Sequence, residues 1–196
     1  MEELLEKIRK EALYEKLPIM DDDGLSFLAD FIGDQGITSL LEVGTCIGYS
    51  AITLAARNPE LVITTLEIDE QRHLRALENV RKAGLEGRIR CICCDSRSWH
   101  IDDRFSAILL DGPKAHNRQL LTRYQDNLTE EGWIIVDDVY FHGFLDNPGV
   151  IRTRRLRTLV RKFSEFQKEL EADPLYECTR LNIGDGLLLA KRGKRT

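Results

Sequence analysis

The fold of this chain is decided by the stretch Leu40-Leu41-Glu42-Val43-Gly44-Thr45-Cys46-Ile47-Gly48-Tyr49-Ser50. An apolar run carries an acid near its end, two glycines then bracket a short loop, and small residues follow from Ser50 to Ala56. This order predicts a strand, a glycine loop and a helix. In such a unit the backbone N–H groups of the loop and the N-terminus of the helix face a ligand.

The acid Glu42 separates this loop from the usual dinucleotide-binding fingerprint. A carboxylate that faces the ligand repels a pyrophosphate and attracts a cation. S-adenosylmethionine (SAM) carries an ammonium and a sulfonium group, so the loop favours SAM over NAD. We expect Glu42 to anchor the methionine end of SAM, directly or by fixing the loop; a structural acid at a buried strand end is the alternative. Gly44 and Gly48 let the backbone approach the ligand, and Ser50 offers its hydroxyl and N–H to the SAM carboxylate.

Helix-like and strand-like segments alternate along the rest of the chain. Hydrophobic periodicity predicts helices over 2–17, from the Asp21–Asp23 caps to Gly33, and over 49–57, 70–83, 114–128 and about 150–172. Strands are predicted over 38–43, 61–67, 88–94, 105–110, 133–136, 176–182 and 187–190. In the helix over 70–83 we expect Leu74, Leu77 and Val80 to point inward.

This alternation predicts an α/β, Rossmann-like fold with a doubly wound, mostly parallel sheet. The last two strands flank Gly184-Asp185-Gly186 and predict an antiparallel C-terminal hairpin. A length of 196 residues fits one domain, so we expect 1–196 to form a single domain that includes the N-terminal helices of 1–36.

Composition narrows the class of protein. No apolar run reaches membrane-spanning length, and a net charge of -5 gives the surface as a whole no attraction for nucleic acid. The five cysteines match no zinc pattern, and the run Cys91-Ile92-Cys93-Cys94 lies in a predicted strand. We therefore expect buried, reduced thiols and a cytoplasmic location.

Acids stand at the predicted carboxyl ends of five strands, where ligands bind in sheets of this kind. They are Glu42, Glu67, Asp95, Asp111 and Asp137. Glu67 lies about twenty residues beyond the glycine loop, where a carboxylate accepts the ribose hydroxyls. Asp95 and Ser96 would meet the adenine, whose N6 amino group suits an acceptor. The alternatives are a solvated strand-end acid for Glu67 and a plain Asp-Ser turn for the other pair.

Together these motifs resemble the metal-dependent class I O-methyltransferases of the catechol and caffeoyl-CoA type. The resemblance rests on the glycine loop, Leu66-Glu67-Ile68-Asp69, Leu110-Asp111-Gly112-Pro113-Lys114 and Val136-Asp137-Asp138-Val139, and covers nearly the whole chain. Within the family, the chain most resembles the bacterial branch that includes the tRNA 5-hydroxyuridine methyltransferase, through Asp138-Val139-Tyr140-Phe141-His142-Gly143, an arginine-rich segment, and Asn182-Ile183-Gly184-Asp185-Gly186-Leu187.

The resemblance implies a class I methyltransferase fold, SAM, a divalent metal and a homodimer, and it adds Met20, Ile68 and Asp111 to the SAM site. A core methionine is the alternative for Met20. The chain departs from the family in two places: Asp137-Asp138 stands where Asp-Asn is usual, and Gly112-Pro113 replaces the residues often found before the lysine.

Asp111, Asp137 and Asp138 are the predicted metal ligands. Three unpaired carboxylates repel one another, so a hard divalent cation is their natural partner. Oxygen donors alone fit Mg²⁺ first, and Mn²⁺ or Ca²⁺, rather than zinc. Adjacent acids on a strand point to opposite faces unless the strand has already ended. A solvated acidic loop is the alternative.

Lys114 and Asp111 are the predicted catalytic residues. A bound cation beside Lys114 disfavours its charged form, so the lysine can take a proton from the acceptor. A surface salt bridge is the alternative. His116 and His142 flank this region, and we expect at most a position at the rim of the substrate site for either.

An arginine-rich helix is the exception to the acidic charge of the chain. Arg152, Arg154, Arg155 and Arg157 are the predicted RNA contacts, and Arg161 and Lys162 extend the same basic face. A solvated helix face is the alternative.

The sequence therefore predicts a SAM- and metal-dependent O-methyltransferase whose acceptor hydroxyl is vicinal to a second oxygen. A catechol has two vicinal oxygens, and so does 5-hydroxyuridine in tRNA. The alternatives are a small-molecule catechol or hydroxycinnamoyl enzyme and a non-catalytic SAM- or RNA-binding module.

Overall fold

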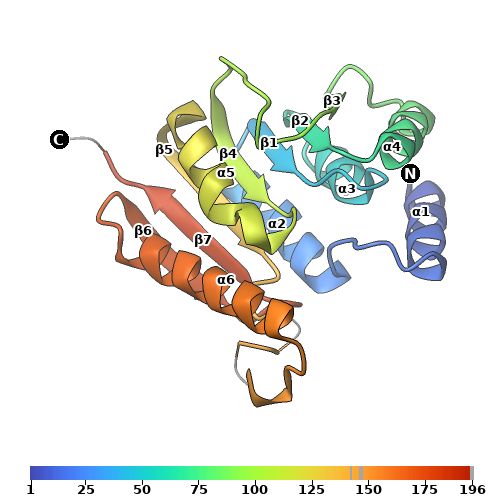
Figure 1. Cartoon of the computed structure of the whole chain (residues 1–196). Coiled ribbons are helices and arrows are strands. Elements are labelled where there is room, and N and C mark those ends of the chain that lie inside the picture. Colours follow the sequence, from blue (N-terminus) through green and yellow to red (C-terminus); the bar gives the residue numbers. More distant parts are fainter. Residues whose placement is uncertain (142, 146–147, 195–196) are drawn as a thin grey trace.

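The computed structural model describes residues 1–141, 143–145 and 148–194 (Figure 1). Within them, seven strands form one sheet in the order β3-β2-β1-β4-β5-β7-β6. Their bounds are β1 (Ser39–Val43), β2 (Val62–Glu67), β3 (Ile89–Cys93), β4 (Phe105–Leu110), β5 (Leu128–Asp137), β6 (Tyr176–Leu181) and β7 (Leu187–Arg192). Strands β1 to β5 pair in parallel, whereas β7 runs antiparallel to both β5 and β6. The predicted parallel sheet with an antiparallel C-terminal hairpin is confirmed.

The helices of the described residues lie between these strands in the predicted order. They are α1 (Glu2–Tyr14), α2 (Asp22–Asp34), α3 (Tyr49–Arg57), α4 (Glu70–Ala83), α5 (Asn117–Tyr124) and α6 (Arg154–Ala172), with short 3-10 helices η1 (Lys114–His116), η2 (Gln125–Asn127) and η3 (Pro148–Val150). Asp21 caps α2, because its carboxylate accepts the N–H of Gly24 at 2.9 Å. The same carboxylate accepts the N–H of Asp185, which ties the start of α2 to the C-terminal hairpin.

Two hydrophobic cores lie on opposite faces of the sheet (Figure 1). On one face Leu40 and its neighbours pack against α1, α2 and α3. On the other face Leu41 and its neighbours pack against α5 and α6, which contributes Phe163 and Phe166. Consecutive strand residues point to opposite faces, so each central strand serves both cores. This three-layer arrangement leaves the carboxyl ends of the parallel strands as the open edge.

The structure corrects the predicted inner face of α4. Leu74 and Leu77 are 57% and 41% exposed, whereas Ala76, Asn79 and Val80 are buried. Steps of three residues turn the side-chain direction by about 60° each, so Leu74 points about 120° away from Val80. The buried stripe follows Val80, and the Asn79 amide donates to the carbonyl of Ile47 in the glycine loop.

Three element boundaries and the cysteines also differ from expectation. The predicted helix over 114–128 is divided into η1, α5 and η2, β5 begins five residues earlier than expected at Leu128, and α6 begins only at Arg154. All five cysteines are free, but only Cys46 among them is buried; Cys91, Cys94 and Cys178 are half-buried, and Cys93 is exposed. Cys93 lies at the end of β3, which is an edge strand of the sheet. In the described part of the chain no helix is long and apolar enough to cross a membrane.

Candidate active site

A cavity of about 450 Å³ opens at the carboxyl ends of the five parallel strands β1 to β5. Predicted site residues that line it are Gly44, Glu67, Ile68, Asp95, Ser96, Asp111, Lys114, Asp137 and Asp138. Its volume suits a cofactor-sized ligand. Residues from five separate loops therefore meet at one place, as the strand-end acids predicted.

The glycine loop forms the floor of this cavity. Gly44 has φ +115°, and a Cβ there would lie 2.5 Å from the carbonyl oxygen of Asp111, so the two strand ends meet only because residue 44 is glycine. Gly48 has φ +86° and begins α3, and its Cβ position faces Ala76 of α4. The role of Gly48 is thus to turn the chain into the helix, and it is not one of the residues that line the cavity.

Glu42 and Ser50 bind each other beneath the loop. The Glu42 carboxylate is fully buried and accepts hydrogen bonds from the hydroxyls of Ser50 and Thr65, both at 2.5 Å. Burial raises the pKa of Glu42 to about 7, although these two hydrogen bonds act in the opposite direction. Neither Glu42 nor Ser50 lines the cavity in this structure. The geometry therefore favours the indirect role for Glu42, in which it fixes the loop.

Glu67 lies in the wall of the cavity at the end of β2. Its Oε2 accepts the N–H of Cys46 at 2.8 Å, and its Oε1 accepts those of Ile68 and Asp69 at 3.0 and 2.9 Å. These three N–H groups hold the carboxylate in one orientation between the glycine loop and the start of α4. Ile68 is 63% exposed and also lines the cavity.

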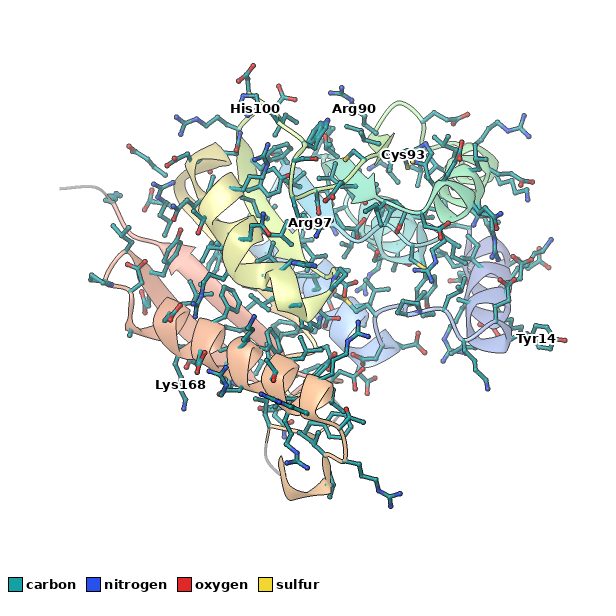
Figure 2. The ribbon with its side chains drawn as sticks, viewed as in Figure 1. Tyr14, Arg90, Cys93, Arg97, His100 and Lys168 are labelled. Carbon is teal, nitrogen blue, oxygen red and sulfur yellow. The ribbon has the colours of Figure 1, made fainter. Side chains whose placement is uncertain are left out.

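Asp95 already has a partner that the sequence analysis did not identify. Arg97 donates to both of its carboxylate oxygens, at 2.6 Å for the closest pair, and lies beside α5 (Figure 2). The Arg97 side-chain hydrogen bond lowers the pKa of Asp95 to about 2. An adenine amino group would thus share this carboxylate with Arg97. Met20, by contrast, is 3% exposed and packs in the core, which favours its alternative reading.

Asp111 and Asp137 form a buried acid pair where the neighbouring strands β4 and β5 end. Their carboxyl groups lie close enough for each to affect the pKa of the other. Burial raises the pKa of Asp111 well above its usual range, and the charge of Asp137 raises it further. Burial also raises the pKa of Asp137, against the opposing effect of Lys114. Lys114 Nζ lies 3.9 Å from Asp111 Oδ1 and donates to the carbonyl oxygen of Asp137 at 2.7 Å.

The donor set at this pair fits a divalent cation. Among the described residues, Asp137 Oδ1 is buried without a hydrogen-bond partner, a costly state for a carboxylate oxygen. Strand β5 ends at Asp137, and Asp138 turns with φ 52°, so both acids face the same cavity. As the side chains stand, no group of three His, Cys, Asp or Glu in the described residues is arranged to hold a metal ion. A bound cation would have to draw these acids together.

The remaining predicted residues lie at the rim or away from the cavity. His116 lines it, and His142 lies outside the described residues. Arg152, Arg154, Arg155 and Arg157 are exposed around the start of α6 and do not line it. The structure adds Arg72, Arg97 and Asp185 to the lining. Of these three residues, only Asp185 lies in a motif that the sequence analysis singled out, the Gly-Asp-Gly turn of the predicted C-terminal hairpin.

Comparison with known proteins identifies the family. The O-methyltransferase family model matches residues 1–193. The chain belongs to the O-methyltransferase family. It is 30% identical to a provisionally named caffeoyl-CoA O-methyltransferase of Arabidopsis thaliana, over 97% of this chain and 86% of that protein. It is 28% identical to the caffeoyl-CoA O-methyltransferase of Populus kitakamiensis, over 87% of this chain and 76% of that protein.

Solved structures show that this O-methyltransferase has the class I methyltransferase fold. A protein of Staphylococcus aureus, provisionally named a caffeoyl-CoA O-methyltransferase, superposes with a TM-score of 0.91 at 29% identity, over 96% of this chain and 92% of that one. The O-methyltransferase of Bacillus cereus, solved with S-adenosylhomocysteine, superposes with a TM-score of 0.81 at 24% identity, over 97% and 90%. The predicted enzyme class and fold are therefore confirmed.

Proposed function

We propose that this enzyme transfers a methyl group from SAM to a hydroxyl that is vicinal to a second oxygen, with the help of a divalent metal. The observation that carries the proposal is the meeting of Lys114 with the Asp111–Asp137 pair in the wall of the cavity that also holds Glu67. Glu67 suits an adenosine, and the acid pair with Lys114 suits proton and oxygen chemistry. The Bacillus cereus relative, solved with S-adenosylhomocysteine, supports SAM as the donor.

SAM would lie across the glycine loop. Glu67 accepts the ribose hydroxyls, Ile68 contacts the adenine face, and Asp95 with Ser96 meets the adenine edge. Glu42 and Ser50 hold the loop from below, since they bind each other there. The cavity wall at Asp111 then lies beside the methyl group.

Asp111, Asp137 and Asp138 would hold the metal, with Mg²⁺ as our first candidate and Mn²⁺ or Ca²⁺ as the others. When bound there, a divalent cation would make the acceptor hydroxyl more acidic. Lys114 receives the hydroxyl proton, because its Nζ is held at the acid pair by the Asp137 carbonyl. The resulting oxyanion attacks the methyl carbon in line, the C–S bond breaks, and S-adenosylhomocysteine leaves. Positioning by the two walls of the cavity supplies much of the rate.

For the acceptor we propose 5-hydroxyuridine in tRNA. The support is the basic start of α6, where Arg152, Arg154, Arg155 and Arg157 are exposed and no described carboxylate lies within ion-pair distance of them. Cations in the first turn oppose the helix dipole, so these arginines do not serve the helix itself. The names of the plant relatives instead favour a small hydroxycinnamoyl acceptor as the second candidate.

Three further expectations belong to this proposal. The family resemblance is the ground for a homodimer, and five unpaired cysteines agree with a reducing cytoplasm. We also keep residues 1–196 as a single domain, since the N-terminal helices contribute Ile8, Ala12 and Leu28 to one of the cores.

Glu67→Ala is expected to weaken SAM binding by about 1–3 kcal/mol, because the ribose hydroxyls lose a charged acceptor. Isothermal calorimetry with SAM measures the change. The matched control is Glu78→Ala, which removes an exposed carboxylate on α4 that pairs with Lys82. If the Glu67 variant keeps the affinity of the wild type, Glu67 does not contact the ribose.

Transfer of a labelled methyl group from SAM to catechol and to bulk tRNA tests the activity and the acceptor. We expect transfer to both, and tRNA affinity that falls steeply with salt because phosphate contacts release counterions. Changing Arg154, Arg155 and Arg157 to glutamine should lower the slope of log affinity against log salt by up to about three.

Two outcomes of this assay would contradict the proposal. No transfer to catechol, tRNA or other vicinal diols would argue against the enzyme activity itself. Transfer to catechol with no salt-dependent tRNA binding would replace tRNA by a small-molecule acceptor.

A further inference from the structure

A second cavity, of about 670 Å³, lies between α5 and α6. Its lining residues are Arg97, Lys114, Ala115, Arg118, Gln119, Thr122, Arg123, Arg161, Lys162, Glu165 and Phe166, and we call it the α5–α6 groove. It shares Arg97 and Lys114 with the cavity at the strand ends. The two cavities therefore adjoin at Arg97 and at Lys114, the residue that we place at the reacting hydroxyl.

The groove is strongly cationic on a protein of net charge -5. Six lining residues are Lys or Arg, and Glu165 is the one acid among them. Three of the arginines have acidic partners: Arg161 pairs with Glu165, Arg118 with Glu169, and Arg97 with Asp95. The first two pairs are exposed, and exposed pairs contribute little, so they yield readily to a stronger anion.

Two of the groove cations, Arg123 and Lys162, have no acidic partner among the described residues. Arg123 donates to the backbone carbonyls of Trp99 and Ser98 at 2.6 and 2.7 Å, so its guanidinium is fixed in place by neutral acceptors. Lys162 is exposed on α6, and no carboxylate of the described residues lies within ion-pair distance of it. A fixed guanidinium and a free ammonium across one groove suit a phosphate group.

We propose that the α5–α6 groove binds the phosphate groups of the methyl acceptor. SAM carries a carboxylate but no phosphate, so a phosphate bound in the groove belongs to the other substrate. The inference thus rests on the proposed function and narrows its acceptor to phosphate-bearing molecules. An RNA backbone and a small acceptor joined to a phosphorylated carrier both present this chemistry. The groove lies beyond the four arginines that we proposed as RNA contacts, and it is closer to the chemistry, because it includes Lys114 itself.

The test uses the full chain and inorganic pyrophosphate as the probe, with binding measured by calorimetry at low salt. The double variant Arg123→Gln/Lys162→Gln should weaken binding by about tenfold or more, the loss expected for charge-assisted hydrogen bonds. The matched control, Arg90→Gln/Lys168→Gln, removes the same charges outside the groove: Arg90 lies on edge strand β3, and Lys168 points away from the body on α6 (Figure 2). The control should bind as the wild type does.

Arg123 anchors two backbone carbonyls, so weaker binding by the double variant alone does not distinguish lost stability from a lost ligand contact. Lys162→Gln alone therefore accompanies it, because Lys162 is exposed and has no ion-pair partner in the part of the chain that the structure describes, and it should weaken binding in the same direction. Equal weakening by the groove and control variants, or no binding of pyrophosphate to the wild type up to about 10 mM, would overturn the proposal.

Coenzyme A and bulk tRNA then separate the two sources of phosphate. The source of the phosphate is the compound that displaces pyrophosphate and whose affinity falls in the groove variants. If neither compound displaces pyrophosphate, the proposal is contradicted. If the protein methylates catechol but does not bind pyrophosphate, the proposal for the groove is wrong and the proposed function stands. Pyrophosphate binding without transfer to any acceptor overturns the proposed function, and with it the assignment of the phosphate to an acceptor.

Discussion

Lys114→Ala is expected to lower the rate of methyl transfer by about 10²- to 10⁴-fold, the range for loss of a general base. SAM binding should weaken by much less, because the lysine faces the acid pair rather than the glycine loop. Its Nζ is held 2.7 Å from the carbonyl oxygen of Asp137, and its side chain is only 9% exposed. A rate loss without a comparable affinity loss is the signature of a group that acts in the chemical step.

Lys114→Arg separates proton removal from simple charge. Arginine keeps a positive charge beside Asp111, but it stays protonated and cannot accept the proton of the acceptor. We therefore expect the arginine variant to be nearly as slow as the alanine variant. Single-turnover rates and SAM titrations on both variants make the comparison. Recovery of the rate by arginine would assign Lys114 an electrostatic role, and poor SAM affinity at a normal rate would assign it to cofactor binding.

The alternation of strands and helices, the strand-end acids and the glycine loop were predictable because each depends on local sequence. Period-two and period-3.6 patterns mark the elements, and a doubly wound sheet brings the carboxyl ends of its strands to one edge. Glu67, Asp111 and Asp137 meet at that edge for this reason alone. The end of β5 at Asp137 also explains how two adjacent acids can face one cavity, because Asp138 already lies beyond the strand.

What the sequence did not predict depends on which side chains meet across elements. For Glu42 the sequence left a direct and an indirect role open, and only the hydrogen bonds from Ser50 and Thr65 below the loop favour the indirect one. Asp95 was expected to be open to adenine, yet Arg97 holds both of its oxygens. The groove cations Arg118, Arg123 and Lys162 come from two helices about forty residues apart, and no spacing along the chain indicates that they share a cavity.

Removal of divalent metal is expected to abolish methyl transfer, by about a thousandfold or more, while the fold remains intact. A metal that polarises a substrate oxygen supplies several kcal/mol, and about 4 kcal/mol is a thousandfold in rate. Thorough EDTA treatment, metal analysis and an activity assay before and after addition of Mg²⁺ make the measurement. Asp137→Asn should show the same loss without chelator, because it replaces the acid whose Oδ1 is buried without a partner in the described structure.

Asp138→Asn tests whether Asp138 takes the place of the asparagine that is usual in the family. It restores the residue usual in the family, and an amide oxygen is also a ligand for Mg²⁺. Activity close to that of the wild type would make Asp138 an equivalent of that asparagine. Activity that survives chelation, with no metal found by analysis, would contradict the metal mechanism whatever the Asp138 variant does.

The metal-free protein also offers a readout that does not depend on activity. Burial raises the pKa of Asp111 and of Asp137, so the folded protein binds protons more tightly at these sites than the unfolded chain does. The free energy of unfolding should therefore fall as the pH rises above about 4, the ordinary pKa of aspartate, towards the raised values. A divalent cation binds the ionised acids and competes with these protons, so Mg²⁺ should raise the melting temperature more at pH 8 than at pH 5. The same Mg²⁺ shift at both pH values, or the full shift in Asp137→Asn, would place the cation away from the acid pair.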